Sequence, residues 1–387
     1  MGERYRAGAI GHTGRGNYGH LLEMAFQGLE QVDFVAIADP DPEGRAAAGE
    51  RTGARRLYAD YRRMLAAEDL DLVSVCPRLP DCHAQMVIAC AEAGARGLLI
   101  EKPLAPTLRE ADALLQACRT HGVKTAVAHR RANPYEQYGK KLVDEGAIGR
   151  LQVLRGHGKA DHRAGSQDLM VLGTHMMDSM RYFAGADVAW VHGHVTEGGR
   201  EVALEDVRQG DEGIGPIAGD GVAAYFAFEN GVTAHYESYR GDTVRRLNNR
   251  WFGFEVYGTE GILALRDSPR GEMYIYRQGL WIPGEENGRW EQVLLNEWER
   301  YPVSERTHQS NLIIVRELIR AIEEDRPVRE CSSGEDGRAA LEMIMAVHES
   351  QLRGARVSLP LDNRENPYET WRRQREEELD SSARQGQ

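Results

Sequence analysis

The sequence has few cysteines and no long hydrophobic run. Its 387 residues include five cysteines, none at CxxC spacing, which argues against a disulfide framework. No stretch approaches the roughly 18 apolar residues of a membrane span. Residues 1–6 contain neither an apolar segment nor a twin-arginine pair. We therefore expect a cytoplasmic protein with reduced cysteines and no membrane partner.

Positive charge is also in deficit. Lys and Arg number 48 against 60 Asp and Glu, a formal net charge of -12, which disfavours attraction to nucleic acid or an anionic membrane surface. A small-molecule partner is the better expectation. A chain of this length exceeds what one hydrophobic core usually supports, so two domains are expected.

Short apolar runs alternate with helical patterns in the first third of the chain. This alternation predicts a mostly parallel sheet covered on both faces, an α/β doubly wound domain over residues 1–130. The expected strands are 7–10, 34–38, 72–76, 97–100 and 125–128, and the expected helices are 20–29, 43–51, 61–67, 84–93 and 108–121.

Residues 131–379 have a different pattern, in which strand-like runs are joined by hairpin signals such as Glu229-Asn230-Gly231. This predicts an α+β domain with a large open, mostly antiparallel sheet. Residues 201–219 are acidic and unpatterned and are expected to form a loop, and the polar residues 380–387 are expected to be disordered. The expected strands are 151–157, 189–195, 222–229, 232–238, 251–257, 262–266 and 273–277, and the expected helices are 135–145, 169–184, 311–324 and 337–352.

A glycine-rich turn, GHTGRGNYGH at residues 11–20, follows the first strand directly. Glycines there let backbone N–H groups and a helix N-terminus approach a pyrophosphate. The literal GxGxxG match begins at Gly14, but the end of the strand at Gly11 favours the register that puts Thr13 in the central place and ends at Gly16. Because Thr13 has a side chain, Gly14 is expected to supply the close approach. An ordinary glycine-rich turn is the alternative.

Asp39 ends the second strand, close to the spacing of roughly 20 residues expected for the acid that binds the adenosine ribose. A carboxylate there repels a 2′-phosphate, so NAD is favoured over NADP. The alternative, compatible with this one, is that Asp39 and Asp41 cap the next helix.

The apolar run Leu98–Ile100 ends at Glu101-Lys102-Pro103. In open α/β sheets ligands collect beyond the carboxyl ends of the strands, and proline stops the strand at this point. Lys102 is therefore expected to face a crevice from a rigid corner. A solvated Glu–Lys pair is the alternative.

These features occur in the order found in the Gfo/Idh/MocA family, the glucose-fructose oxidoreductase and inositol dehydrogenase group, and the chain resembles that family over nearly its whole length. Gly173-Thr174-His175 with Asp178 is similar to the family's helix carrying an active-site histidine. The resemblance implies an N-terminal Rossmann domain, NAD(P)-dependent chemistry at a hydroxyl carbon of a sugar or cyclitol, and a homodimer or homotetramer. The cofactor contacts expected are Gly11, Thr13, Gly14, Arg15, Gly16, Asp39, Pro77, His83, Glu101 and Lys102.

One position departs from the family pattern, because Val171 stands where the family commonly has Asp, four residues before His175. Asp168 is a possible substitute, since positions seven apart on one helix share a face. Hydride leaves a carbinol carbon only as its hydroxyl proton is removed. We expect His175 to accept that proton, because imidazole titrates near neutral pH, with Lys102 polarising the oxygen and Glu101 orienting the lysine. Lys102 as the base stays open.

Substrate contacts are expected from Asp178, one helical turn beyond His175, and from the donor-rich loop that holds His157, His162 and Arg163. A buried structural role is the alternative for His175 and Asp178. No metal site is expected, since neither an HxxxH spacing nor a cysteine partner is present.

The function predicted is an NAD-dependent oxidoreductase that moves a hydride between a secondary hydroxyl of a sugar, glycoside or cyclitol and nicotinamide. One alternative is a glycosidase or lyase that retains NAD and oxidises the sugar transiently. Another is a non-catalytic NAD-binding regulator, which the departures at Thr13 and Val171 motivate.

Overall fold

The computed structural model describes residues 4–239, 251–266, 271–282, 284 and 288–385. The chain forms two compact units. The first contains residues 1–106, 110–137 and 294–339, and the second contains residues 107–109, 138–293 and 340–387.

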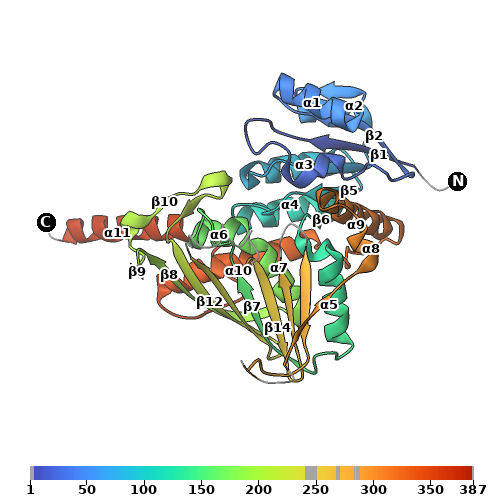
Figure 1. Ribbon diagram of the computed structural model, residues 1–387. Helices are drawn as coiled ribbons and strands as arrows, with labels where there is room; N and C mark the ends of the chain where they lie inside the picture. Colours follow the sequence, from blue (N-terminus) through green and yellow to red (C-terminus); the bar gives the residue numbers. More distant parts are fainter. Residues whose placement is uncertain (1–3, 240–250, 267–270, 283, 285–287, 386–387) are drawn as a thin grey trace. The chain divides into compact units, whose positions relative to one another are not determined.

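The first unit is built on a sheet of six parallel strands in the order β3-β2-β1-β4-β5-β6 (Figure 1). This confirms the predicted doubly wound fold. Only β3 was not predicted, because its three residues are exposed or half-buried and carry no apolar run. The strands are β1 (Tyr5–Ile10), β2 (Val32–Ala38), β3 (Arg56–Tyr58), β4 (Leu72–Val75), β5 (Gly97–Ile100) and β6 (Lys124–Val127). Its helices include α1 (Pro42–Thr52), α2 (Tyr61–Glu68), α3 (His83–Glu92) and α4 (Leu108–Thr120).

Helix α9 (Val303–Glu323) returns late in the sequence to the first unit. It contacts β5 and β6, and its apolar face shares one core with Leu99 of β5 and Ala126 of β6. The expected domain boundary near residue 130 differs from this division, because the helix that completes the first core is supplied from residues 294–339. The buried residues that α9 contributes to that core include Leu312, Val315, Leu318 and Ile319.

The second unit is built on a large open sheet, ten-stranded within the described residues, in the order β17-β16-β15-β14-β7-β13-β12-β8-β18 with β9 beside β8 (Figure 1). Its pairs are antiparallel except β7 with β13. The predicted open, mostly antiparallel sheet is confirmed. The strands are β7 (Leu151–His157), β8 (Val188–Glu197), β9 (Arg200–Glu201), β12 (Gly221–Phe228), β13 (Thr233–Tyr239), β14 (Gly253–Gly258), β15 (Ile262–Arg266), β16 (Glu272–Tyr276), β17 (Trp290–Val293) and β18 (Val357–Ser358).

The helix predicted over residues 169–184 is two helices, α6 (Gly165–Val171) and α7 (Gly173–Ala184). The helical backbone is interrupted between them at Leu172, whose φ is -115°. Helix α7 packs on one face of the sheet, where a Cβ at Gly156 of β7 would lie 2.4 Å from the Met180 side chain. The chain also contains helices α5 (Pro134–Asp144), α8 (Asn296–Glu299) and α10 (Gly334–Arg353).

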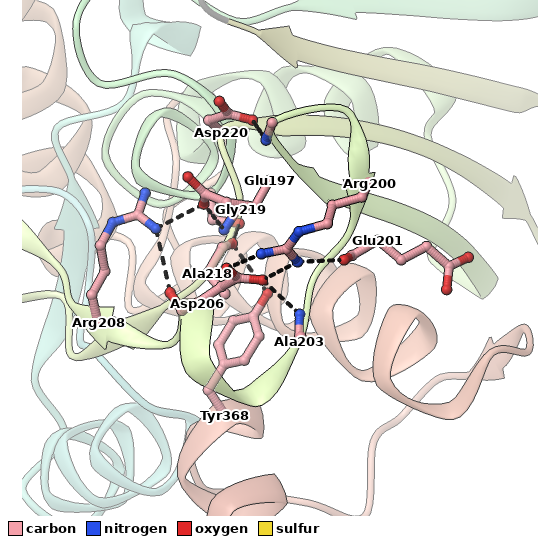
Figure 2. Close-up of polar contacts among 12 residues, drawn as sticks. Glu197, Arg200, Glu201, Ala203, Asp206, Arg208, Ala218, Gly219, Asp220 and Tyr368 are labelled. Carbon is pink, nitrogen blue, oxygen red and sulfur yellow. Dashed lines mark hydrogen bonds and ion pairs between the residues drawn. The ribbon is translucent and has the colours of Figure 1, made fainter.

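Residues 201–219 were expected to form a loop, but ion pairs and short elements order this segment (Figure 2). Both guanidinium Nη atoms of Arg200 lie 2.7 Å from the Asp206 carboxylate, and Arg208 lies 2.9 Å from Glu197. Glu197 also accepts a hydrogen bond from the backbone of Gly219 at 3.1 Å. Acidic side chains in and beside this segment therefore form ion pairs with its arginines. The short strands are β10 (Arg208–Gln209) and β11 (Pro216–Ile217).

The expected disordered tail, residues 380–387, is wrong for its described part, because helix α11 runs over Pro367–Gln385. Polar residues such as Glu, Arg and Gln are good helix formers, so a solvated helix satisfies the same composition. Tyr368 anchors its first turn by a 3.3 Å hydrogen bond to the Ala218 carbonyl oxygen. Residues 386–387 lie outside the described residues. Within the described chain, none of the helices combines the length and apolar character needed to cross a bilayer.

Candidate active site

The glycine loop, residues 11–19, uses its glycines in two different ways. Gly16 has φ +87°, and a Cβ there would lie 2.7 Å from the backbone nitrogen of Arg78. Gly14 has φ +81°, and no described atom lies within 4 Å of a Cβ built there. Gly16 is therefore required by the neighbouring backbone, whereas Gly14 leaves open space for the close approach of a ligand.

Asp39 directly follows β2 and is fully buried. Its carboxylate accepts hydrogen bonds from the backbone nitrogen and the hydroxyl of Thr13. The Thr13 side chain is thus turned toward the end of β2. Of the two acids expected to cap the next helix, Asp41 is the one at the N-terminus of α1, where its side chain accepts a hydrogen bond from Gly44 N at 2.7 Å.

A cavity of about 310 Å³ opens beside the glycine loop. A glycine loop after the first strand and a carboxylate after the second are features that the dinucleotide fingerprint places beside such a cavity. The residues present fit NAD. The lining includes Gly11, His12, Arg15, Asp39, Arg62 and Asp81.

Two charged residues of the lining pair with each other, because the Arg15 guanidinium contacts the Asp81 carboxylate. The other Asp81 oxygen, Oδ1, is buried and has no hydrogen-bond partner among the described residues. Arg15, expected to contact the cofactor, is therefore held at the cavity by an acid that sequence reasoning missed.

The helix predicted over residues 20–29 is wrong. Residues Gly19–Met24 form a 3-10 turn in which His20 and Leu21 have left-handed φ values of 46° and 59°. Asn311 of α9 holds this turn by donating to the His20 carbonyl oxygen at 2.8 Å. The expected helix N-terminus at the pyrophosphate is therefore absent from the described loop, and the turn directs the His20 side chain toward the end of β5.

The Glu101-Lys102-Pro103 turn follows β5 as predicted, and its two charged residues are buried. Glu101 is inaccessible and Lys102 is 4% exposed. Lys102 Nζ lies 4.0 Å from Glu101 Oε1, and the same oxygen lies 2.7 Å from His20 Nδ1. Gly19 permits this approach, since a Cβ there would lie 2.7 Å from Glu101 Cδ. His20, Glu101 and Lys102 therefore form one contiguous polar chain.

The Glu101 carboxylate is held in its charged form. Burial acts to raise the pKa of Glu101, but the adjacent His20 and Lys102 outweigh it and hold the pKa below its ordinary value. His20 was missed from the sequence because it reads as the first residue of a helix. The signal available was its position just after Gly19, the glycine that passes over Glu101.

His83 was expected to contact the cofactor, but its ring is fully buried. Its Nε2 lies 2.7 Å from the Pro77 carbonyl oxygen, and its Nδ1 lies 3.2 Å from the Leu104 carbonyl oxygen. Burial lowers the pKa of His83. His83 therefore braces the turn after β4 against the turn after β5, and Pro77 serves as its acceptor.

In the second unit, α7 carries His175 near its start and Asp178 one turn later. His175 is 8% exposed, and Asp178 is inaccessible. Asp168 lies on the separate helix α6, so the argument that positions seven apart share one helical face does not apply to it.

The Asp168 carboxylate supports the loop after β7. Its Oδ2 accepts hydrogen bonds from Ser238 Oγ at 2.6 Å and from Ala160 N at 3.4 Å. A Cβ at Gly158 would lie 2.2 Å from the same oxygen. Burial raises the pKa of Asp168.

The structure shows different surroundings for the three remaining substrate candidates, His157, His162 and Arg163. His157 follows Gly156 in β7, so its side chain points away from α7, and its ring nitrogens contact Glu237 at 3.1 Å and Glu255 at 2.8 Å. The His162 side chain is 76% exposed. Arg163 is held by Asp161, with Nη2 to Oδ2 at 2.6 Å and Nε to Oδ1 at 3.1 Å. Among the described residues no three His, Cys, Asp or Glu side chains are grouped as a metal ion would require.

Comparison with known proteins identifies the family. The family model described as "Oxidoreductase family, NAD-binding Rossmann fold" matches residues 6–129, and the GFO/IDH/MocA C-terminal domain matches residues 137–264. D-apiose dehydrogenase of Paraburkholderia graminis is 30% identical over 287 residues, 70% of this chain and 70% of its own. The chain belongs to the Gfo/Idh/MocA oxidoreductase family.

Other members of the Gfo/Idh/MocA family are similar over comparable lengths. Levoglucosan dehydrogenase of Pseudarthrobacter phenanthrenivorans is 29% identical over 299 residues, 69% of this chain and 75% of that protein. A solved structure of levoglucosan dehydrogenase in complex with NADH and levoglucosan has a TM-score of 0.70 at 23% identity, covering 93% of this chain and 100% of that one. The predicted family, the oxidoreductase class and the NAD cofactor are confirmed.

Proposed function

We propose that this NAD-binding oxidoreductase is a dehydrogenase acting on a secondary hydroxyl of a sugar, glycoside or cyclitol. The observation that carries the proposal is the buried Glu101–Lys102 pair, with Nζ 4.0 Å from the carboxylate, at the end of β5 where family resemblance places the catalytic lysine. The names of the relatives support the substrate class, since levoglucosan and D-apiose are carbohydrates.

Each residue has a role in this proposal. Asp39 and the backbone at Gly14 hold NAD, and bound NAD⁺ supplies the hydride acceptor. Lys102 Nζ, 4.0 Å from the Glu101 carboxylate, donates a hydrogen bond to the substrate oxygen. His175 accepts the hydroxyl proton at a ring nitrogen.

Asp178 is proposed to bind substrate hydroxyls from α7. His157 is left out of this set because Glu237 and Glu255 take both of its ring nitrogens. His162 and Arg163 stay candidates, although the Arg163 guanidinium would have to exchange Asp161 for the substrate.

The test is NADH formation by the purified protein with NAD⁺ and a panel of anhydrosugars, aldoses, glycosides and inositols. We expect NADH with at least one of them. Lys102→Met should lower kcat/KM about a hundredfold or more, the loss typical of a removed proton-handling group. Lys141→Met is the matched control, because Lys141 is 62% exposed and pairs only with Glu145 at 3.7 Å among the described residues.

Other outcomes favour other functions. Glycoside cleavage without net NADH indicates an NAD-retaining glycosidase or lyase, and full turnover by Lys102→Met indicates that the lysine is not catalytic. Lys102→Arg separates the two assignments of the base, because arginine donates hydrogen bonds but does not deprotonate. Residual activity in that variant, together with its loss in His175→Gln, supports His175 as the base.

A further inference from the structure

Thr13 stands in the central place of the glycine register, where the dinucleotide fingerprint has glycine. Its backbone nitrogen lies 3.1 Å from each Asp39 carboxylate oxygen, and its hydroxyl donates to Oδ2 at 2.7 Å. Asp41 N donates to Oδ1 at 3.0 Å. Two of the three donors on this carboxylate therefore come from one residue of the glycine loop.

Helix α1 provides the room for this side chain. A Cβ at Gly44, in the first turn of α1, would lie 1.9 Å from Thr13 Oγ1 and 2.4 Å from Thr13 Cβ. The absence of a side chain at Gly44 thus accommodates the one at Thr13. Gly14, with open space beyond its Cα, takes over the close approach that the central glycine ordinarily provides.

Two arginines beside the same strand end make the orientation of Asp39 important. Arg45 donates from Nη1 to the Asp39 carbonyl oxygen at 2.6 Å, and Arg62 lines the cavity. Guanidinium groups are well suited to bind a phosphate. The Asp39 carboxylate, with Asp60 of the same lining, therefore opposes a 2′-phosphate at a site where arginines favour one.

We propose that Thr13 determines cofactor specificity by fixing the Asp39 carboxylate. Thr13 and Asp41 make four hydrogen-bond contacts with the two Asp39 oxygens. A carboxylate has about four lone-pair directions, so these contacts fix its orientation. Because Asp39 is fully buried, protein contacts set its orientation. Thr13 acts as a positioning residue, through Asp39.

The experiment measures dissociation constants for NADH and NADPH by fluorescence titration of four proteins: wild type, Thr13→Val, Thr13→Ser and Thr13→Ala. The Thr/Val and Ser/Ala pairs each differ in the hydroxyl. We expect Thr13→Val and Thr13→Ala to bind NADH about fivefold or more weakly, the effect of one hydrogen bond, and to bind NADPH no more weakly than wild type. Thr13→Ser should keep wild-type preference.

The proposal is overturned if Thr13→Val and Thr13→Ala leave the preference for NADH over NADPH unchanged. It is also overturned if Thr13→Ser lowers that preference as much as Thr13→Ala does. In the latter case packing at Gly44 is responsible. Thermal unfolding without cofactor checks the fold of each variant. If Thr13→Val does not fold, the comparison of Ser with Ala decides alone. Because all readouts are binding constants, failure here leaves the proposed dehydrogenase activity untouched.

Discussion

His20 Nδ1 lies 2.7 Å from Glu101 Oε1, so a ring whose side chain is 45% exposed contacts a carboxylate that solvent does not reach. The left-handed backbone at His20 and the Asn311 hydrogen bond to its carbonyl oxygen produce this approach. The contact joins the solvent-facing ring to Glu101 and, through Glu101, to the proposed catalytic lysine.

Replacing His20 should therefore alter the pH dependence of turnover. His20→Asn keeps a residue that tolerates left-handed backbone but is too short to reach Glu101. The pKa of Glu101 should rise, because a partner that holds it below its ordinary value is lost. As pH falls, activity that requires the Glu101 anion should then be lost at a higher pH than in wild type. At neutral pH, kcat should be lower than that of wild type by about tenfold.

The measurement is kcat against pH for wild type, His20→Asn and His20→Gln. A glutamine amide can donate to the carboxylate, so His20→Gln should recover part of the loss. An acidic limb that stays at the same pH in both variants would contradict a role for this contact.

Gly14 and Gly16 should respond differently to alanine although their φ values are similar, +81° and +87°. Gly16→Ala adds a clash with Arg78 N and should lower the thermal midpoint by several degrees. Gly14→Ala meets no described atom within 4 Å and should lose only about 1 kcal/mol to backbone strain, while weakening NAD⁺ binding about tenfold or more. Equal losses of stability and binding in the two variants would refute this division of roles.

The Arg15–Asp81 ion pair predicts opposite effects on cofactor affinity. The pyrophosphate is anionic, so removing the negative charge in Asp81→Asn should strengthen NAD⁺ binding about threefold. Arg15→Ala leaves Asp81 without its guanidinium partner and should weaken binding about tenfold. Isothermal titration at two salt concentrations checks both, and the differences should shrink at high salt. Stronger NAD⁺ binding by Arg15→Ala would contradict the role of Arg15 in binding the cofactor.

His348 of the second unit should make stability depend on pH. Burial lowers its pKa from 6.5 to about 4, and its Nδ1 lies 3.1 Å from the Tyr368 hydroxyl. As pH falls from about 6.5 to about 4, the unfolded chain takes up a proton that the folded chain does not. The free energy of unfolding should therefore decrease over that window, by roughly 3 kcal/mol in total.

Urea unfolding between pH 7 and pH 4 checks this prediction. His348→Asn keeps a nitrogen donor near the Nδ1 position and should flatten the curve in that window. His162→Asn is the control, because the His162 side chain is 76% exposed, and it should behave as wild type. Parallel curves for His348→Asn and wild type would count against the buried histidine as the cause.

Sequence reasoning predicted the features that depend on local pattern. The apolar runs predicted most strands of both sheets, although not the short strands β3, β9, β17 and β18. Glu101-Lys102-Pro103 lies at the end of β5 because proline stops a strand there. It did not predict His20, whose left-handed backbone depends on Asn311, a residue 291 positions away. Nor did it predict that His157 points away from α7, since that depends on the register of β7 in a sheet not yet assembled.

Composition misled in two places for the same reason. Residues 201–219 and 380–387 are polar, and polarity alone does not distinguish an unstructured segment from one whose charges have partners. Arg200 and Asp206 order the first, and helix α11 includes most of the second. The partners become visible only when the chain is folded.

The place of α9 in the sequence has a consequence for biosynthesis. During translation, β1 to β6 leave the ribosome long before Leu312, Val315 and Leu318, the side chains that cover Leu99 and Ala126. The apolar surface of the nascent Rossmann sheet therefore stays uncovered while most of the second unit is synthesised. We therefore expect a fragment ending at residue 137 to be poorly soluble, because it lacks the helix that completes its core.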